Sequence, residues 1–162
     1  MKYCETEIVF REFPDEITLA INISNCPHRC KGCHSPHLQT DCGQELDENA
    51  LKELIEPKKD QITCVGFMGG DADIERLEEL MSYVRVNWPK LSIGWYSGYA
   101  DLVDLRKTNK NLEYPITWIE NCLDYVKTGP YVEELGPLDS PTTNQRMFKK
   151  VVDEWKEIKL YN

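Results

Sequence analysis

The sequence predicts an α/β fold in which helices pack against a parallel sheet as part of a β/α barrel. Segments with strand character alternate along the chain with segments of helical period, and this alternation is typical of parallel βα units. A complete eight-fold barrel needs about 250 residues, so a chain of 162 residues can form only a partial, incomplete parallel barrel. There is no internal repeat, low-complexity tract or linker, and we expect one domain over residues 1–162.

The first predicted elements have clear local signals. Residues 17–23 are rich in β-branched side chains and predict a strand. Residues 48–56 have the pattern of a helix, with Asp47 as its N-cap. Residues 62–68 form a short, nearly continuous apolar run that stops at Gly69, as expected for a strand buried on both faces of a parallel sheet.

The second half of the chain has fewer strong signals. Its predicted elements are a helix over 73–86, a strand over 91–96, a short helix over 100–107, and weaker strands over 116–119 and 123–126. The segment 129–143 is rich in Pro, Gly and acidic residues and predicts a loop. The pattern of residues 145–160 does not decide between strand and helix.

Composition limits the classes of partner. The net charge of −9 argues against nucleic acid, whose binders present a basic face, and against anionic membrane surfaces. No apolar run approaches the roughly 20 residues that span a bilayer, and the N-terminus lacks the apolar stretch of a signal peptide. We therefore expect a cytoplasmic protein.

The seven cysteines are distributed unevenly, with three of them in one short loop. An odd number with such a cluster indicates a metal site in a reducing compartment and not a secreted disulfide framework. The other four occur singly in the sequence, and Cys64 lies in an apolar run where it is expected to be a small core residue. These four are Cys4, Cys42, Cys64 and Cys122.

The clustered cysteines, Cys26, Cys30 and Cys33, have the spacing Cys-x3-Cys-x2-Cys. Three thiolates so close together can hold a metal centre, but cubane iron–sulfur clusters normally take four cysteine ligands. A chain that supplies only three leaves one iron open to another ligand. Two other interpretations stay open at this point: a structural zinc ion bound by three Cys and one His, or cysteines with no ligand.

Three histidines, His28, His34 and His37, lie in or just after the cysteine loop and are the candidate fourth zinc ligands. We favour solvated loop side chains for all three. The aromatic run of Trp95, Tyr96 and nearby Tyr99 is expected to contribute core and pocket wall.

Two further loops follow predicted strands, as the cysteine loop does. Gly69, Gly70 and Asp71 follow the strand at 62–68, and Ser97 follows the strand at 91–96. The carboxyl ends of parallel strands meet at one edge of the sheet, where βα folds carry their chemistry. The sequence therefore predicts one shared site, although Gly-Gly-Asp is also a common strand-ending turn.

The spacing of the cysteine triplet resembles the signature of the radical S-adenosylmethionine superfamily. Within it, the chain resembles the activating protein family of anaerobic ribonucleoside-triphosphate reductase. The matching motifs are the run from Asn25 to His34, Gly69-Gly70-Asp71, the run 95–99, Gly129-Pro-Tyr and Asn144-Gln145-Arg146. The chain departs from that family at Ala72, where the family usually has Pro.

This resemblance implies a fold of the radical SAM type and an oxidoreductase with two cofactors. A [4Fe–4S] cluster would be held by Cys26, Cys30 and Cys33, with S-adenosyl-L-methionine on the fourth iron. Reductive cleavage of this cofactor would give a 5′-deoxyadenosyl radical, which installs a glycyl radical on the reductase. No catalytic side chain is implied beyond the cluster and the cofactor. The implied cofactor contacts are Gly32, Cys33, His34, Gly69, Gly70, Asp71 and Ser97.

The implied partners are the large, glycyl-radical subunit of anaerobic ribonucleotide reductase and an electron donor such as a flavodoxin or ferredoxin. One alternative is an activase of another glycyl-radical enzyme, of the pyruvate formate-lyase type, whose members are generally longer. A second alternative, from a different class, is a non-catalytic zinc-binding interaction module.

Overall fold

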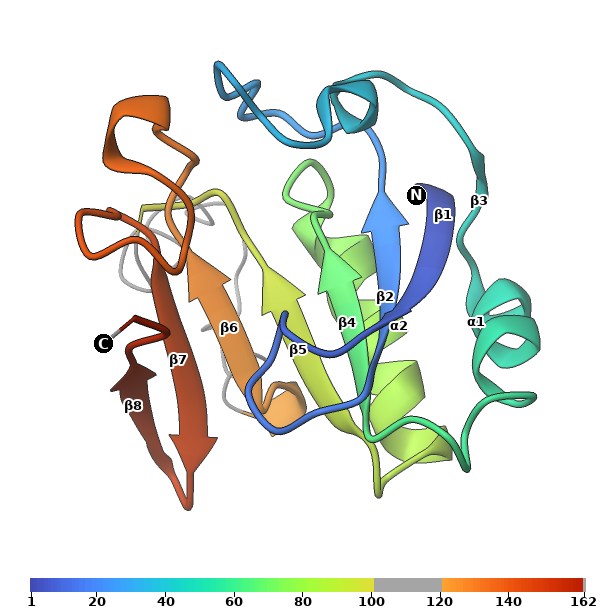
Figure 1. The fold of residues 1–162 in the computed structure, drawn as a ribbon. Coiled ribbons are helices and arrows are strands. Elements are labelled where there is room, and N and C mark those ends of the chain that lie inside the picture. Colours follow the sequence, from blue (N-terminus) through green and yellow to red (C-terminus); the bar gives the residue numbers. More distant parts are fainter. Residues whose placement is uncertain (101–120, 162) are drawn as a thin grey trace.

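The computed structural model describes residues 1–100 and 121–161, in which one mixed sheet carries its two α-helices on one face (Figure 1). The strands are β1 (Lys2–Val9), β2 (Thr18–Ile23), β3 (Gln44–Glu45), β4 (Cys64–Met68), β5 (Ser92–Tyr96), β6 (Tyr125–Thr128), β7 (Arg146–Val151) and β8 (Glu154–Ile158). The helices are α1 (Glu48–Ile55), α2 (Ile74–Asn87) and the short 3₁₀ helices η1 (Pro36–Gln39) and η2 (Glu133–Leu135).

The strand order in the sheet is β3-β1-β2-β4-β5-β6-β7-β8. The four central strands β2, β4, β5 and β6 are parallel, whereas the outer strands on both sides pair in antiparallel fashion. The carboxyl ends of the central strands therefore point to one edge, which is the upper edge in Figure 1. That this mixed sheet is a section of a β/α barrel stays a prediction.

Several predicted elements are observed with their ends shifted by a residue or two. The segments at 17–23, 48–56, 62–68, 73–86 and 91–96 appear as β2, α1, β4, α2 and β5. The undecided tail forms the β7–β8 hairpin. The helix predicted over 100–107 and the strand predicted over 116–119 lie, apart from Ala100, outside the described residues.

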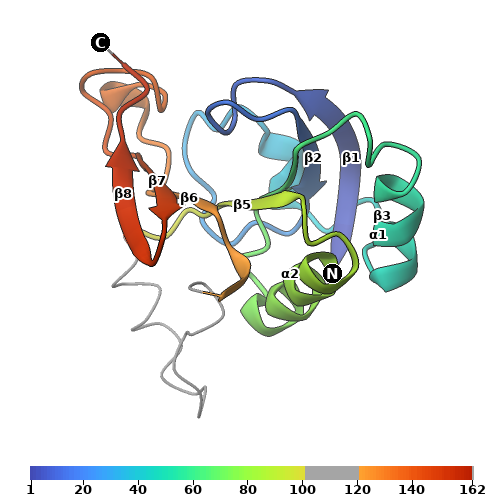
Figure 2. The same ribbon diagram turned by 90° about the horizontal axis from the view of Figure 1, so that it is seen from below.

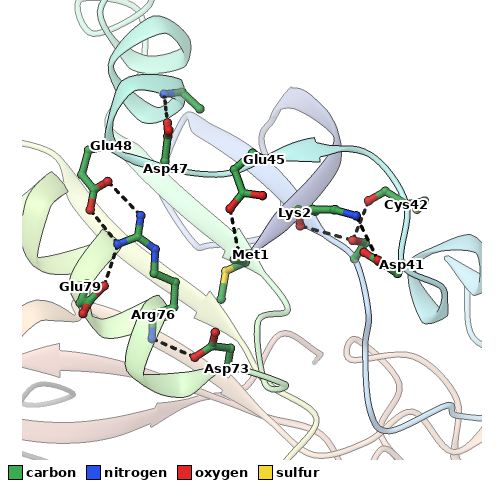
Figure 3. A network of polar contacts seen from close by, with 12 residues as sticks. Met1, Lys2, Asp41, Cys42, Glu45, Asp47, Glu48, Asp73, Arg76 and Glu79 are labelled. Carbon is green, nitrogen blue, oxygen red and sulfur yellow. Dashed lines mark hydrogen bonds and ion pairs between the residues drawn. The ribbon is translucent and has the colours of Figure 1, made fainter.

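Both α-helices begin at an aspartate whose side chain accepts a backbone hydrogen bond. Asp47 accepts from the Ala50 N–H and Asp73 from the Arg76 N–H, which satisfies donors that the first helical turn leaves free. The Arg76 guanidinium also donates to both carboxylate oxygens of Glu48, at 2.8 and 2.9 Å, and so ties α2 to α1 (Figure 3). No helix in the described ranges is long and apolar enough to cross a bilayer.

The main core lies between the sheet and the two helices. Leu51 and Ile55 of α1, together with the apolar face of α2, pack against the β-branched residues of the central strands. Burial of such side chains stabilises the fold by roughly 1.5–3 kcal/mol each. This core fixes the helical face of the sheet and leaves the other face to be covered by other segments.

Segment 10–17, which joins β1 to β2, covers the face opposite α2 (Figure 2). Its residue Phe13 is completely buried. The ring lies so close to the strands that a Cβ added to Gly94 would be 2.3 Å from Phe13 Cζ, which no real packing allows. Glycine in the middle of β5 is therefore required by the ring of Phe13.

A disulfide joins Cys4 of β1 to Cys42, which precedes β3. The sequence did not predict this bond, since the two cysteines lie far apart along the chain; the antiparallel pairing of Tyr3 with Gln44 brings them together. A separation of 38 residues carries no pairing information until that register is known. The Ser24 hydroxyl donates to the Cys42 carbonyl at 2.7 Å, so the bridge borders the start of the cysteine loop.

Candidate metal and cofactor site

The candidate site is a cavity of about 390 Å³ at the carboxyl ends of the central strands. This volume lies within the range of roughly 300–1,000 Å³ that is typical of small-molecule sites. Predicted site residues that line it are Cys26, Cys30, Cys33, His34, Gly69, Asp71 and Ser97. Gly32 and Gly70 do not line it, and their backbones turn with positive φ angles of 71° and 100°.

The floor of the cavity is one row of side chains across the four parallel strands. Strand register aligns Asn22 with Met68, Met68 with Tyr96, and Tyr96 with Lys127. All four residues line the cavity. The shared register explains how residues far apart in the sequence form a single surface.

The cysteine loop folds back on the η1 segment. The Cys26 N–H donates to the Leu38 carbonyl at 2.9 Å, and the Cys33 N–H donates to the Cys30 carbonyl at 3.3 Å. The three thiols are free and half-buried at the cavity wall. Burial raises the pKa of the Cys26 thiol, and the charge of Asp71 raises it further, so a cationic centre would be needed to stabilise its thiolate.

Asp71 is buried at the end of the Gly-Gly turn that follows β4. Its Oδ2 accepts a 2.7 Å hydrogen bond from the Gly98 N–H and lies 2.6 Å from His28 Nε2. Its Oδ1 is buried without a hydrogen-bond partner. An unsatisfied buried acceptor costs roughly 1–3 kcal/mol, so this oxygen fits a site that receives a donor from a ligand.

Ser97 is buried at the end of β5, and its hydroxyl oxygen accepts from the Tyr99 N–H at 3.1 Å. The hydroxyl therefore closes a turn, a role that serine commonly takes where a strand ends. The residue also lines the cavity, and its contact with a cofactor stays a prediction.

Lys127 is a residue of the site that sequence reasoning missed. It is only 8 % exposed, and its Nζ donates to the Gly129 carbonyl at 2.7 Å and to the Ser97 carbonyl at 3.4 Å. Burial lowers the pKa of Lys127 to about 8, although the negative charge of Asp71 opposes this decrease. A single lysine directly after the predicted strand 123–126 was the signal available in the sequence.

His28 was missed as well, and the expectation of a solvated ring is wrong for it. Its side chain is 19 % exposed and contacts the Asp71 carboxylate. The expectation agrees better with the other two histidines, which are exposed. His34 stacks edge-on against Tyr131 with ring centroids 5.0 Å apart, and His37 lies 3.1 Å from a carboxylate oxygen of Glu5.

The loop after β6 forms another wall of the cavity. Pro130, Tyr131 and Leu138 line it, together with Gln145 at the end of the loop. The Asn144 side-chain amide donates to the Pro130 carbonyl at 2.9 Å, which joins the two C-terminal motifs in space.

Comparison with known proteins identifies the family. A family model described as a 4Fe–4S single cluster domain matches residues 17–153. The chain belongs to this family. No curated protein and no solved structure gives a match.

Membership makes this an iron–sulfur, metal-binding chain with one [4Fe–4S] cluster. Among the described residues, the free cysteines that line the cavity are Cys26, Cys30 and Cys33. No three His, Cys, Asp or Glu side chains there are close enough to hold a single metal ion. A cubane cluster binds each thiolate through a different iron atom, so its ligands stand further apart than those of one zinc ion. Three free thiols on one cavity wall fit the cluster that this family carries.

Proposed function

We propose that this 4Fe–4S protein is a radical S-adenosylmethionine enzyme that installs a glycyl radical on anaerobic ribonucleoside-triphosphate reductase. The observation that carries the proposal is the composition of one cavity. It contains three cluster thiols, a buried carboxylate with one unpartnered oxygen, and a buried lysine. We also propose that the mixed sheet is a section of the partial β/α barrel that such enzymes use.

Two buried side chains of opposite charge suit the two ends of an amino acid. Asp71 Oδ1 would accept from the ammonium group of the methionine part, and Lys127 would donate to its carboxylate. Both are charge-assisted hydrogen bonds, which are stronger than neutral ones. The ligand would also offset the cost of burying each side chain, since the folded chain leaves Asp71 Oδ1 unpaired and lowers the pKa of Lys127.

Held by Cys26, Cys30 and Cys33, a reduced cluster would supply one electron to the sulfonium group of S-adenosylmethionine, and breakage of a C–S bond would give methionine and a 5′-deoxyadenosyl radical. The residues of the chain bind, orient and shield. The Gly69 N–H donates to the Tyr96 carbonyl and the Trp95 indole N–H to the Gly69 carbonyl, at 3.0 and 2.9 Å. These bonds fix the turn that presents Asp71.

The substrate would be a protein. A primary radical must be shielded from water and from other hydrogen donors, and the glycine loop of a reductase subunit would close the cavity as it binds. The electron would come from a flavodoxin or ferredoxin, and we expect all three proteins in the cytoplasm.

Electron paramagnetic resonance tests this proposal. The anaerobically reconstituted chain is mixed with a glycyl-radical reductase, S-adenosylmethionine and a reductant, and the partner is expected to acquire the doublet signal of a glycyl radical. A partner whose target glycine is replaced by alanine should bind without giving the signal. Turnover of a small metabolite, with no radical on any such partner, would show that the activase proposal is wrong.

A further inference from the structure

The imidazole of His28 joins the cysteine loop to the other two loops of the site. Its Nε2 lies 2.6 Å from Asp71 Oδ2, and its ring stands perpendicular to that of Tyr99 with centroids 5.0 Å apart. A Cβ added to Gly98 would lie 2.3 Å from His28 Cδ2. The ring therefore occupies the space that the missing side chain of Gly98 leaves.

The chemistry of the pair fixes the direction of the hydrogen bond. A carboxylate oxygen accepts hydrogen bonds, so the imidazole tautomer with its hydrogen on Nε2 completes the contact with Asp71 Oδ2. The Gly98 N–H donates to the same oxygen at 2.7 Å. Two donors on Oδ2 hold the carboxylate in one orientation and leave Oδ1 as the oxygen without a partner.

We propose that His28 is a positioning residue that fixes Asp71 relative to the cluster. It stands in the loop between Cys26 and Cys30, so its bond to Asp71 sets where the ligand's ammonium group binds with respect to the iron. This inference rests on the proposed function, because it assigns Asp71 to S-adenosylmethionine. His28 does not touch the reacting atoms and is not a catalytic residue.

Three substitutions separate the hydrogen bond from the packing of the ring. His28→Phe keeps a ring against Tyr99 but removes the donor, and His28→Gln keeps an N–H donor without the ring. His37→Phe is the matched control, because His37 also pairs with a carboxylate, that of Glu5, but is 52 % exposed and does not line the cavity. All are prepared as anaerobically reconstituted, cluster-loaded protein.

Three quantities are measured: iron and sulfide content, the dissociation constant of S-adenosylmethionine by titration calorimetry, and the change in the spectrum of the reduced cluster on addition of the ligand. His28→Phe is expected to keep its cluster, to bind the ligand about tenfold more weakly and to show a smaller spectral change. His28→Gln should recover part of the affinity, and His37→Phe should match the wild type.

A double-mutant cycle with Gly98 identifies the contact itself. Gly98→Ala is expected to weaken binding as His28→Phe does, because the added methyl group displaces the ring. In a His28→Ala background the same change should cost little, since the ring is already absent, and this non-additivity would support the proposal. Additive effects would mean that Gly98 acts through another contact and would overturn it.

The other outcomes are equally decisive. Wild-type affinity in His28→Phe would overturn the positioning role while the proposed function stands. Loss of the cluster in that variant would also overturn it, because His28 would then act on the cysteine loop alone. If the wild-type protein keeps its cluster but binds no S-adenosylmethionine, the proposed function fails, and the role of His28 fails with it.

Discussion

Two neighbouring rows of side chains on the same face of the sheet have opposite surroundings. The row of Gly66, Gly94 and Tyr125 lies against the fully buried ring of Phe13. The row two residues further along the strands, which contains Lys127, borders a cavity of about 390 Å³. The same strands are thus packed solidly toward their amino ends and left open at their carboxyl ends.

The carboxylates near the two rows differ in whether their oxygens have hydrogen-bond partners. At the amino end, the Glu16 carboxylate accepts from Ser92 at 2.9 Å, from Tyr125 at 3.1 Å, and from Thr63. At the carboxyl end, Asp71 keeps one buried oxygen unpaired. The difference therefore lies in the two carboxylates: Glu16 has its hydrogen-bond partners within the chain, whereas Asp71 keeps one oxygen for a donor from a ligand.

The largest expected effect is on the iron content, and it distinguishes a cysteine at the carboxyl ends of the central strands from one near their amino ends. Cys30→Ala should reduce iron and sulfide from about four of each per chain to almost none, because the cluster has no spare thiolate at the cavity. Cys64→Ala is the control, since Cys64 is completely buried near the amino end and burial raises the pKa of its thiol. Loss of iron in Cys64→Ala, or its retention in Cys30→Ala, would contradict the assignment.

The second prediction concerns Phe13, whose ring packs against the row of Gly66, Gly94 and Tyr125. Phe13→Ala is expected to lower the free energy of unfolding by about 3–5 kcal/mol, because it leaves a cavity against two strand glycines. Phe10→Ala, in the same connecting segment but with Phe10 68 % exposed, should change it by less than about 0.5 kcal/mol. Denaturant unfolding measures both, and equal effects would mean that Phe13 does not hold the sheet.

A substitution in the row that borders the cavity should change ligand affinity more than stability. Lys127→Met is expected to weaken S-adenosylmethionine binding about ten- to a hundredfold, because a buried cation opposite the ligand carboxylate is lost. Stability should fall by less than about 1 kcal/mol, since a buried charge is removed at the same time. Lys149→Met, on the adjoining strand β7, should leave the affinity unchanged. A stability loss as large as that of Phe13→Ala would refute the contrast between the rows.

Asp71→Asn tests the opposite charge in the cavity. The substitution replaces a charge-assisted hydrogen bond with a neutral one and is expected to weaken ligand binding by about tenfold, or 1–2 kcal/mol. The cluster should form normally, because Asp71 is not one of its ligands. Unchanged affinity in a calorimetric titration would return Gly69-Gly70-Asp71 to the role of a simple strand-ending turn.

The smallest expected effect is a dependence on pH. The pKa of Lys127 is lowered to about 8 in the free protein, and a bound carboxylate should raise it. Protonated lysine binds the carboxylate better, so affinity should fall as pH rises through 8, by about fourfold between pH 7 and pH 8.5. Binding at the higher pH should take up a proton, and titrations in two buffers measure this uptake. Lys127→Met should abolish it.

Local sequence patterns were sufficient to predict several elements of this fold. Apolar runs mark β4 and β5, aspartates mark the starts of α1 and α2, and the spacing of three cysteines marks the cluster loop. Each signal lies within a dozen or so residues of sequence, where the period of a strand or helix is expressed. β1 escaped notice because Glu5 and Glu7 interrupt it and no continuous apolar run marks it.

The contacts that complete the site were decided by tertiary structure. The His28–Asp71 bond spans 43 residues, the contact of Lys127 with Ser97 spans 30, and the disulfide partner of Cys4 lies 38 residues away. Sequence alone placed the cysteines and the Gly-Gly-Asp turn at strand ends. Which side chains meet there depends on strand order and register, because a shift of one residue moves every side chain to the other face of the sheet.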